Sequence, residues 1–397
     1  MKKLLMLGGA MQQIPAIKAA KEMGCYVITC DYLPGNPGHS FADEYYNVST
    51  TDKDAVLKLA EELKIDGIVA YASDPAAPTA AYVAESMGLP TNPYVSVETL
   101  CNKDRFRRFL LENGFNAPRS AGYTTEVEAR SGVDQFRFPI IIKPVDSSGS
   151  KGVTVLYRPE SIDAAISFAF AFSRSHRIII EEYIEKKHRY LIGGDIFIQD
   201  GKIILWGLLN CHRDAKVNPL VPVGKSYPPE LEPADLQAVK DTLQQMVDKL
   251  QICFGAMNVE LVVDSQGRVW PIDVGPRNGG NMIPDLLGMI FHVDVVEMTI
   301  LAAMGEKYCR EIAKGERFYA THNLHSDRNG RFREIRIHPE LEGKILRTCV
   351  YKKPGDQVEF FDNAAKALGI VFMHFENGTE MNRHLSDICR EIEIVLD

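Results

Sequence analysis

Apolar positions in the first ninety residues alternate between short runs of strand length and longer stretches with helical spacing. Each of three strand-like runs precedes one stretch in which apolar residues recur every three or four positions, and these pairs cover residues 3–7 and 12–23, 26–30 and 52–63, and 67–71 and 79–87. Gly24 and Gly88 follow two of the helical stretches, where glycine commonly ends a helix. This order predicts a parallel, doubly wound α/β sheet over residues 1–95, with helices on both faces.

Beyond residue 95 the pattern becomes that of an α+β region. Strand-like sequence fills most of residues 140–209, and helical spacing marks residues 96–111, 161–172, 233–250, 294–304 and 380–390. Residues 212–233 are polar and rich in proline, which predicts a loop. We therefore expect a domain over residues 96–310, with a lobe at about residues 115–185, and a C-terminal subdomain over residues 311–397.

The segment at residues 258–280 predicts a hairpin that carries two acidic side chains. Strand-like runs at 258–264 and 269–274 flank a four-residue loop that contains glycine. If Asp264 pairs with Val269, Glu260 falls opposite Asp273, and two facing carboxylates repel each other unless a cation lies nearby. Mg²⁺ suits carboxylates that act together with phosphate oxygens. The alternative is an exposed hairpin whose acids only keep the surface soluble.

A second segment, at residues 140–157, predicts a strand that ends in Lys143 and enters a loop of serine and glycine. Small residues let backbone N–H groups approach an anion closely, and Lys143 and Lys151 add positive charge. The loop joins strand to strand and lacks G-x-x-x-x-G-K-[ST], so it is not a P-loop. A flexible hairpin with solubilising lysines is the alternative.

A third segment, at residues 177–184, is an isoleucine-rich strand that runs directly into Glu181 and Glu182. A strand end with free backbone groups can bind the edge of an adenine, and a glutamate can accept a hydrogen bond from its amino group. The alternative, a strand that simply emerges into water, is the commoner case for such a sequence taken alone.

Composition narrows the class of protein. Hydrophobic residues make up 45% of the chain and charged residues 25%, as in globular proteins, and the net charge of −8 disfavours a nucleic-acid partner. The eight cysteines include no C-x-x-C pair, which disfavours a zinc ribbon and suits a reducing cytoplasm. The first apolar run is too short for a signal peptide, and no apolar stretch is long enough to span a membrane. We expect a cytoplasmic protein.

The glycine pair after the first strand, with Asp31 at the end of the second, raises a dinucleotide-binding alternative. Gly8 and Gly9 lie at the turn, but the sequence there lacks G-x-G-x-x-G spacing. A nicotinamide-dependent oxidoreductase is therefore the weakest of the functions considered.

Taken together and in this order, the three segments resemble the ATP-grasp superfamily over most of the chain. The resemblance implies an α/β plus α+β fold: an N-terminal doubly wound parallel sheet, the pre-ATP-grasp domain, followed by a two-lobed ATP-grasp fold. Within the superfamily, the opening sequence and the KPGD segment near the end look like carboxylate–amine ligases and the carbamoyl-phosphate-synthase-like branch.

The resemblance also implies roles for individual residues. Those that would bind ATP are Lys103, Lys143, Ser147, Ser148, Gly149, Ser150, Glu181, Glu182, Tyr183, Ile184 and His188. Glu260 and Asp273 match the metal ligands, and Arg277 and Lys143 match the catalytic cations. The implied cofactors are ATP and one or two Mg²⁺ ions.

This sequence departs from the family pattern at the second metal ligand. The family usually has glutamate followed by x-Asn-Pro-Arg, whereas this chain has Asp273 and then Gly275 where the asparagine would stand. Asn278 and Asn281 are the candidates to replace that asparagine. His188 stands about where the family often has a ribose-binding glutamate. These differences keep a catalytically weak, nucleotide-binding sensor among the alternatives.

The activity implied by the resemblance is that of an ATP-dependent ligase. A carboxylate would be activated as an acyl phosphate and attacked by an amine, with release of ADP and phosphate. A bicarbonate-using carboxylase or carbamoyl-type enzyme is the close alternative. The partners of the ligase would be a small-molecule carboxylate and a small-molecule amine, with no nucleic acid or membrane. A homodimer is the default assembly.

Two further polar groups are candidate substrate contacts, with an ordinary structural role as the more frequent alternative. They are His212, Arg213 and Asn218 in the proline-rich segment, and His322, His325 and Arg328 near the start of the C-terminal subdomain. The histidines show no ordered spacing of metal ligands.

Overall fold

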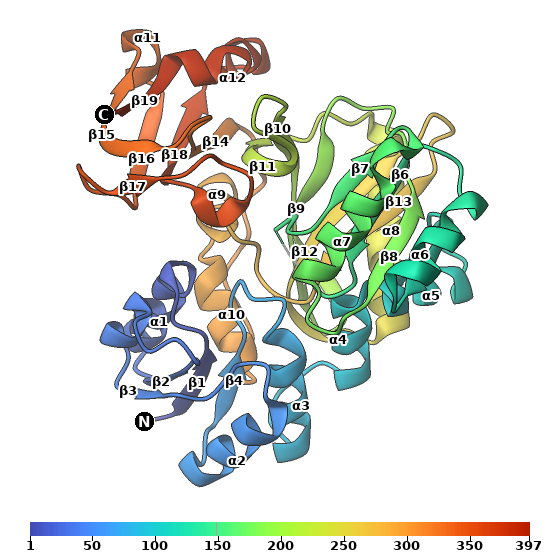
Figure 1. Cartoon of the computed structure of the whole chain (residues 1–397). Coiled ribbons are helices and arrows are strands. Elements are labelled where there is room, and N and C mark those ends of the chain that lie inside the picture. The colour runs from blue at the N-terminus through green and yellow to red at the C-terminus, as the bar shows by residue number, and fades with distance from the viewer. Residues whose placement is uncertain (148) are drawn as a thin grey trace.

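A parallel four-stranded sheet forms the centre of the N-terminal domain in the computed structural model, which describes residues 1–147 and 149–397 (Figure 1). Its strands are, in spatial order, β3 (Glu44–Tyr46), β2 (Tyr26–Cys30), β1 (Lys3–Leu7) and β4 (Gly67–Val69). Because helices cover both faces, β1 and β2 are apolar along nearly their whole length rather than alternating. The predicted doubly wound parallel sheet is confirmed.

The two faces of this sheet are covered by different parts of the chain. Helices α2 (Lys53–Leu63) and α3 (Ala77–Met87) cover one face. The other face packs against α1 (Ile14–Glu22) and against α10 (Val295–Ala303), which lies beside the blue N-terminal domain in Figure 1. The core of the N-terminal domain therefore includes residues that lie far beyond position 95.

The predicted helix at residues 96–111 is two helices, α4 (Tyr94–Cys101) and α5 (Lys103–Glu112). Asn102 has an extended backbone (φ −124°, ψ 114°) and its side chain accepts a hydrogen bond from the Arg105 N–H. Asparagine is a better N-cap than a helix-interior residue, so the chain bends there and restarts. The bend places Lys103 at the first turn of α5, where its N–H donates to the Val145 carbonyl.

A four-stranded antiparallel sheet forms a lobe of its own, drawn in green in Figure 1. Its strands, in spatial order, are β5 (Ser120–Tyr123), β8 (Ile178–Glu182), β6 (Ile140–Pro144) and β7 (Thr154–Leu156). Helices α6 (Glu126–Gly132) and α7 (Ile162–Phe172) pack on it around the isoleucines of β6 and β8. The loop between β6 and β7 is the serine- and glycine-rich segment.

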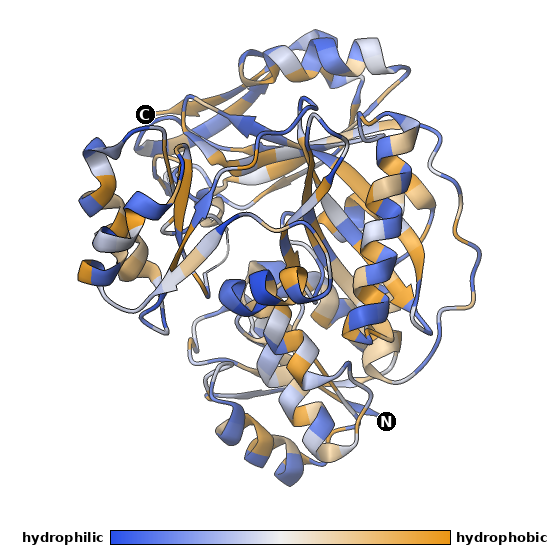
Figure 2. Ribbon diagram, turned by 90° about the vertical axis from the view of Figure 1, so that its right-hand side faces the viewer, coloured by the Kyte–Doolittle hydropathy of each residue, from blue (hydrophilic) through white to orange (hydrophobic). Residues whose placement is uncertain are grey.

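An eight-stranded antiparallel sheet carries the rest of the molecule. In spatial order its strands are β13 (Val269–Gly275), β12 (Phe254–Val263), β9 (Leu191–Gln199), β10 (Lys202–Asp214), β11 (Asn218–Tyr227), β14 (Phe318–Leu324), β18 (Gly369–Phe375) and β16 (Ile345–Val350). Helix α8 (Pro233–Leu250) packs in one core cluster with β9, β12 and β13, and α9 (Ile283–Phe291) packs in another. In Figure 2 many strand residues are orange, whereas outer helices alternate blue and orange, as expected for elements that bury one face.

The C-terminal residues complete this sheet and add a small layer. β14, β18 and β16 continue the large sheet, and a second sheet contains β17 (Gln357–Val358), β15 (Gly330–Ile337) and β19 (Ile392–Leu396). Helix α12 (Gly378–Glu391) packs with both, beside the short α11 (Pro339–Glu342). No single described helix is long and apolar enough to cross a membrane, and α9 with α10 meets that test only as a pair bent by 112°.

The prediction of a loop at residues 212–233 is wrong, because β10 and β11 form a hairpin there. Val221 and Val223 are buried, and so are the three residues that follow Val223, so much of this proline-rich segment belongs to the core. Pro222 pairs with Arg213 at a register irregularity. Regular hydrogen bonding between the two strands is already interrupted at this irregularity. The strand therefore tolerates a proline, which has no N–H group to donate.

The acidic hairpin has a different register from the predicted one but the same facing pair. Val263, not Asp264, pairs with Val269, and an irregularity between Glu260 and Leu261 shifts the register by one residue. Glu260 consequently pairs with Asp273, as predicted. A bulge of this kind bends the strand locally and changes where a side chain points.

Asp264 is displaced from the strand because it organises the turn. Its carboxylate accepts hydrogen bonds from the N–H groups of Gln266 and Arg268, from Arg268 Nε at 2.7 Å and from Trp270 Nε1 at 2.9 Å. Asp264→Ala is expected to lower the free energy of unfolding by about 1–3 kcal/mol, since these donors lose a charged acceptor. Urea denaturation measures this, and an unchanged midpoint would contradict it.

Candidate active site

A cavity of about 640 Å³ lies between the four-stranded lobe and the large sheet. Its lining contains most of the residues predicted to bind nucleotide, namely Lys103, Lys143, Ser147, Gly149, Ser150, Glu181, Glu182, Tyr183 and Ile184, together with Glu260 and Asp273. Ser148 lies outside the described residues. The fold thus brings three sequence segments, which are spread over more than a hundred positions, to one space.

Glu181 is the centre of a buried network of charges. Arg107 donates to it through Nε at 2.8 Å and through a terminal nitrogen at 3.3 Å, and Lys143 Nζ lies 2.7 Å from the second carboxylate oxygen. All three side chains are almost fully buried. Burial raises the pKa of Glu181, but the two cations outweigh it and hold that pKa at about 2.

This network changes the role expected for Glu181. With both carboxylate oxygens bound to cations, the side chain is occupied and does not serve as the free acceptor for an adenine amino group that the sequence suggested. It fixes Lys143 at the end of β6 instead. Burial lowers the pKa of Lys143, and the neighbouring Glu181 carboxylate opposes that shift. The pairing therefore favours a charged ammonium group at the cavity wall.

Arg107 is a residue that the sequence analysis missed. It follows Lys103 by four positions on α5, so both side chains leave the same side of the helix. Besides Glu181, it donates to the Ile272 carbonyl at 2.6 Å. It therefore joins α5, β8 and β13, and the i,i+4 spacing of two basic residues was the only sequence signal for it.

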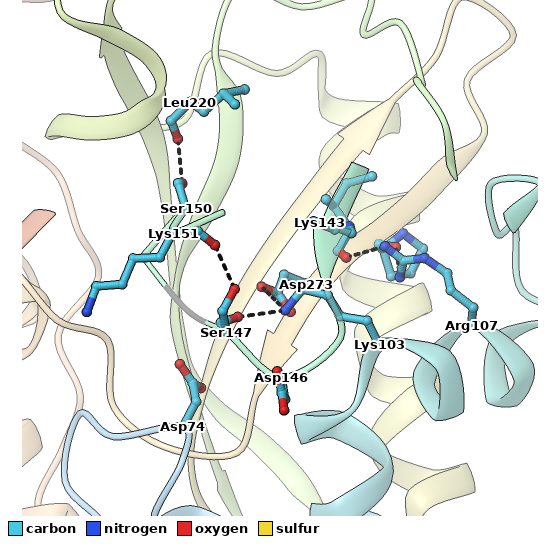
Figure 3. A network of polar contacts seen from close by, with 12 residues as sticks. Asp74, Lys103, Arg107, Lys143, Asp146, Ser147, Ser150, Lys151, Leu220 and Asp273 are labelled. Carbon is cyan, nitrogen blue, oxygen red and sulfur yellow. Dashed lines mark hydrogen bonds and ion pairs between the residues drawn. The ribbon is translucent and has the colours of Figure 1, made fainter. Parts of the chain in front are cut away.

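Lys103 connects the acidic hairpin to the serine-rich loop, as Figure 3 shows. Its Nζ donates to the Ser147 carbonyl at 3.0 Å and lies 3.7 Å from Asp273 Oδ2. Burial raises the pKa of Asp273, but the positive charge of Lys103 and its neighbours is stronger and leaves that pKa below its ordinary value. Asp273 is consequently an ionised carboxylate at neutral pH.

Glu260 also has a protein cation beside it. Arg213 lies 3.4 Å from Glu260 Oε1. The two facing carboxylates are therefore each accompanied by one basic side chain, Arg213 or Lys103, and a metal is not their sole source of positive charge. Two carboxylates that line one cavity still form a set that suits Mg²⁺ when phosphate oxygens complete the coordination.

The loop between β6 and β7 rests on the large sheet. Ser147 Oγ donates to the Lys151 carbonyl at 2.8 Å, and Ser150 Oγ donates to the Leu220 carbonyl of β11 at 2.9 Å (Figure 3). Gly149 and Gly152 have φ values of 67° and 73°, which glycine adopts without strain. Ser147, Gly149 and Ser150 of this loop line the cavity.

Arg277 is held by an ion pair with the N-terminal domain. It contacts the Asp74 carboxylate through Nε at 2.7 Å and a terminal nitrogen at 2.5 Å. Asp74 follows β4, so this bidentate pair connects the N-terminal domain to the residues after the acidic hairpin.

A second cavity, of about 270 Å³, adjoins the first. Asp74, Lys151, Lys225, Arg277 and Asn281 are among the residues that line it. Gly149, Ser150, Glu260 and Asp273 line both cavities. The acidic pair and the tip of the loop therefore stand where the two spaces meet.

Some candidates lie elsewhere. Of the described residues, His188 is not on the lining of either cavity: its Nδ1 donates to the Tyr190 carbonyl and its Nε2 accepts from the Val263 N–H at 2.9 Å. The geometry gives His188 a structural role and does not support the ribose contact. Asn278 is buried and its Oδ1 accepts from Thr299 at 3.0 Å, so it does not replace the family's metal-binding asparagine.

The candidate substrate contacts divide in the same way. His212 and Arg213 line the larger cavity. Among the described residues, the other four candidates are absent from the lining of both cavities: Asn218, His322, His325 and Arg328. Asn218 instead donates to the Asp362 carbonyl at 2.8 Å and holds the C-terminal subdomain.

Comparison with known proteins agrees with this geometry. A family model described as the ATP-grasp domain matches residues 136–285, which include β6, the loop after it, β8 and the acidic hairpin. Residues 136–285 of this chain belong to the ATP-grasp superfamily. The predicted fold, an N-terminal parallel sheet followed by a two-lobed ATP-grasp domain, is confirmed with it.

Curated relatives resemble parts of this ATP-grasp protein. It is 26% identical over 296 residues to an uncharacterized protein of Sinorhizobium fredii, a match that covers 72% of this chain and 59% of that protein. It is 29% identical over 187 residues to the formate-dependent phosphoribosylglycinamide formyltransferase of Prochlorococcus marinus, covering 46% and 47% of the two chains. The chain thus spans about half the length of the curated relatives it matches.

Solved structures of other ATP-grasp proteins share the whole fold. The L-amino acid ligase from Bacillus licheniformis superposes with a TM-score of 0.81 at 18% identity, covering 100% of this chain and 99% of that one. Phosphoribosylglycinamide synthetase from Anaerococcus prevotii gives 0.77 at 20% identity with both chains fully covered. The biotin carboxylase domain of the Hydrogenobacter thermophilus 2-oxoglutarate carboxylase, in complex with MgADP, ADP and bicarbonate, gives 0.75 at 16% identity and covers 100% and 91%.

Proposed function

We propose that this protein is an ATP-dependent ligase that activates a carboxylate as an acyl phosphate and joins it to an amine, with release of ADP and phosphate. The observation that carries the proposal is the position of Glu260 and Asp273 between two adjoining cavities. One cavity has the volume and the lysines for a nucleoside triphosphate, and the other is smaller and has Lys151, Lys225 and Arg277 on its lining. A phosphoryl group transferred between two substrates must pass such a boundary.

ATP is assigned to the larger cavity. Backbone groups of residues 182–184 would bind adenine, and Lys103 and Lys143 would neutralise the phosphates beside the loop of residues 146–152. Glu260 and Asp273 would hold Mg²⁺, which supplies charge neutralisation for the transferred phosphoryl group. Gly275 offers no side-chain ligand, so a second ion would depend on Asn281, which lines the adjoining cavity.

The carboxylate is assigned to the smaller cavity. Lys151, Lys225 and Arg277 are the cations on its lining that would contact an anion, and Arg277 is also paired with Asp74. The carboxylates on the same lining, Glu260 and Asp273, would face the metal ion at the boundary. A carboxylate oxygen attacks the γ-phosphorus and the bond to ADP breaks. The amine nitrogen then attacks the acyl carbon, loses a proton and expels phosphate. Closure of the 146–152 loop excludes the water that would otherwise hydrolyse the acyl phosphate.

The direct test is phosphate release with Mg-ATP across a matrix of carboxylates and amines, with bicarbonate as one of the acids and Lys143→Ala as the blank. We expect release that requires both one organic acid and one amine. Release with bicarbonate and no organic acid would replace this proposal with the carboxylase alternative. Tight ATP binding without phosphate release in any combination would favour the nucleotide-binding sensor. A cytoplasmic location and a homodimer stay predictions.

A prediction for the loop follows from its contact with β11. Ser150→Ala removes the hydroxyl that donates to Leu220 and is expected to raise KM for ATP about threefold to tenfold, the effect of one hydrogen bond on loop closure. Initial rates of ADP formation at varied ATP measure it. Ser131→Ala, on an exposed helix of the same lobe, is the matched control, and equal KM values for the two variants would contradict the prediction.

A further inference from the structure

Three side chains of different chemistry converge at the edge of the C-terminal subdomain, apart from both cavities. Asp214 ends β10, His325 follows β14, and Cys389 lies on α12. Asp214 Oδ2 is 3.3 Å from His325 Nε2 and 3.7 Å from Cys389 Sγ, and the three atoms all lie within 4.8 Å of one another. The His325 side chain is only 5% exposed, whereas Cys389 is exposed. The three side chains are therefore accessible to solvent at Cys389.

The hydrogen bond of the other ring nitrogen, His325 Nδ1, determines which nitrogen faces Asp214. Nδ1 lies 2.6 Å from the Asn323 carbonyl oxygen, which can only accept a hydrogen bond, so Nδ1 carries the proton. Nε2 is then the ring nitrogen that faces the Asp214 carboxylate, and Cys389 Sγ contacts the same carboxylate oxygen. A backbone carbonyl that orients a histidine in this way is the usual support of a metal-binding imidazole.

Two of the three distances between these atoms suit a tetrahedral ion. Zinc bonds of about 2.0–2.3 Å to nitrogen, oxygen and sulfur place neighbouring ligand atoms about 3.3–3.7 Å apart. The two distances from Asp214 Oδ2, 3.3 Å and 3.7 Å, fall in that range. A thiolate, an imidazole and a carboxylate together select zinc over Mg²⁺, which prefers oxygen ligands only.

We propose that Asp214, His325 and Cys389 form a Zn²⁺ site that is separate from the ATP-binding cavity. The Cys389 thiol gives up its proton to solvent when the sulfur–metal bond forms, and water fills the fourth position. The inference is independent of the proposed ligase activity, since it uses none of the residues assigned to ATP or to the carboxylate.

The position of the site indicates what the ion would do. It would tie α12 and the end of β14 to the tip of the β10–β11 hairpin. Leu220, on the same hairpin, receives the hydrogen bond from Ser150 of the loop over the ATP cavity. Zinc would therefore hold in place the surface on which that loop closes, while leaving the catalytic residues untouched.

The test is metal binding by the full-length protein after chelation and removal of the chelator, with excess Mg²⁺ present. We expect one equivalent of Zn²⁺ by titration, a zinc-dependent rise in Tm, and, with Co²⁺ as the probe, a near-ultraviolet sulfur-to-cobalt charge-transfer band. Cys389→Ser should lose that band and bind Zn²⁺ at least about tenfold more weakly.

Cys309→Ser is the matched control, because Cys309 is also exposed but lies outside the cluster. It should bind zinc as the unmodified protein does. His325→Gln is the second variant, and Cys389→Ser keeps the proposal testable if the buried histidine proves necessary for folding. Equal zinc affinity in Cys389→Ser and Cys309→Ser, or failure of the unmodified protein to take up a stoichiometric ion, would overturn the proposal.

Discussion

Glu260→Gln is expected to lower kcat for ATP consumption at least about a hundredfold while leaving the folded structure intact. The substitution keeps the size of the side chain but removes the charge that, with Asp273, would hold Mg²⁺ at the boundary of the two cavities. Among the described residues, the ion pair that it weakens is the 3.4 Å contact with Arg213, which is partly exposed, so Tm should change little. Phosphate release at saturating ATP, beside a thermal melt, separates catalysis from stability.

Glu297→Gln is the control for that experiment. Glu297 is an acid on α10 that pairs with Arg310 on the surface, away from both cavities. It should retain near-normal turnover. A Glu260→Gln protein that consumes ATP as fast as the Glu297→Gln protein would remove the acidic pair from the mechanism, and with it the main support for the ligase proposal.

Glu181→Gln is expected to cause the largest loss of stability, about 3–5 kcal/mol, because it leaves the buried cations Arg107 and Lys143 without a compensating charge. Glu182→Gln is the matched control one residue along the same strand. Its nearest cation, Arg137, is exposed and 3.7 Å away, so a change below about 1 kcal/mol is expected. Guanidinium denaturation of the two proteins measures the difference, and similar values would refute the buried network.

The pH dependence of stability gives an independent readout of the same carboxylate. The pKa of Glu181 falls from its ordinary value of 4.5 to about 2 on folding. A lowered pKa contributes stability that is complete above the unfolded value and is lost as pH falls from about 4.5 towards 2. Glu181→Gln should therefore show a flatter loss of stability over that acid range than Glu182→Gln.

Local sequence was enough to find the acidic hairpin, the strand that ends in Lys143 and the parallel sheet, because each depends on spacing within a short segment. The facing pair of Glu260 and Asp273 was predicted correctly, although the assumed pairing of Asp264 with Val269 was wrong. Neither the bulge after Glu260 nor the role of Asp264 in the turn is visible in a pattern of apolar residues. Register is the property that local patterns specify least.

Contacts between distant segments could not be predicted. Asp74 and Arg277 are 203 positions apart, and Arg107 meets Glu181 across 74 positions. Helix α9 was also missed, because Ile283–Phe291 is a short apolar run in which Asp285 is the one charged residue, and such a run does not distinguish a helix from a strand. The zinc proposal shows the same limit: its three ligands come from three elements, and no spacing in the sequence connects them.

The shared packing of α10 has a practical consequence for engineering. A fragment that begins near residue 96 would present Val296, Ile300 and Met304 to solvent, because their partners are Leu4, Met6 and the rest of the first sheet. Such a truncation should be insoluble. A chimera that exchanges the first domain with that of another superfamily member would need to carry the matching residues of α10 along with it, or redesign both sides of the contact together.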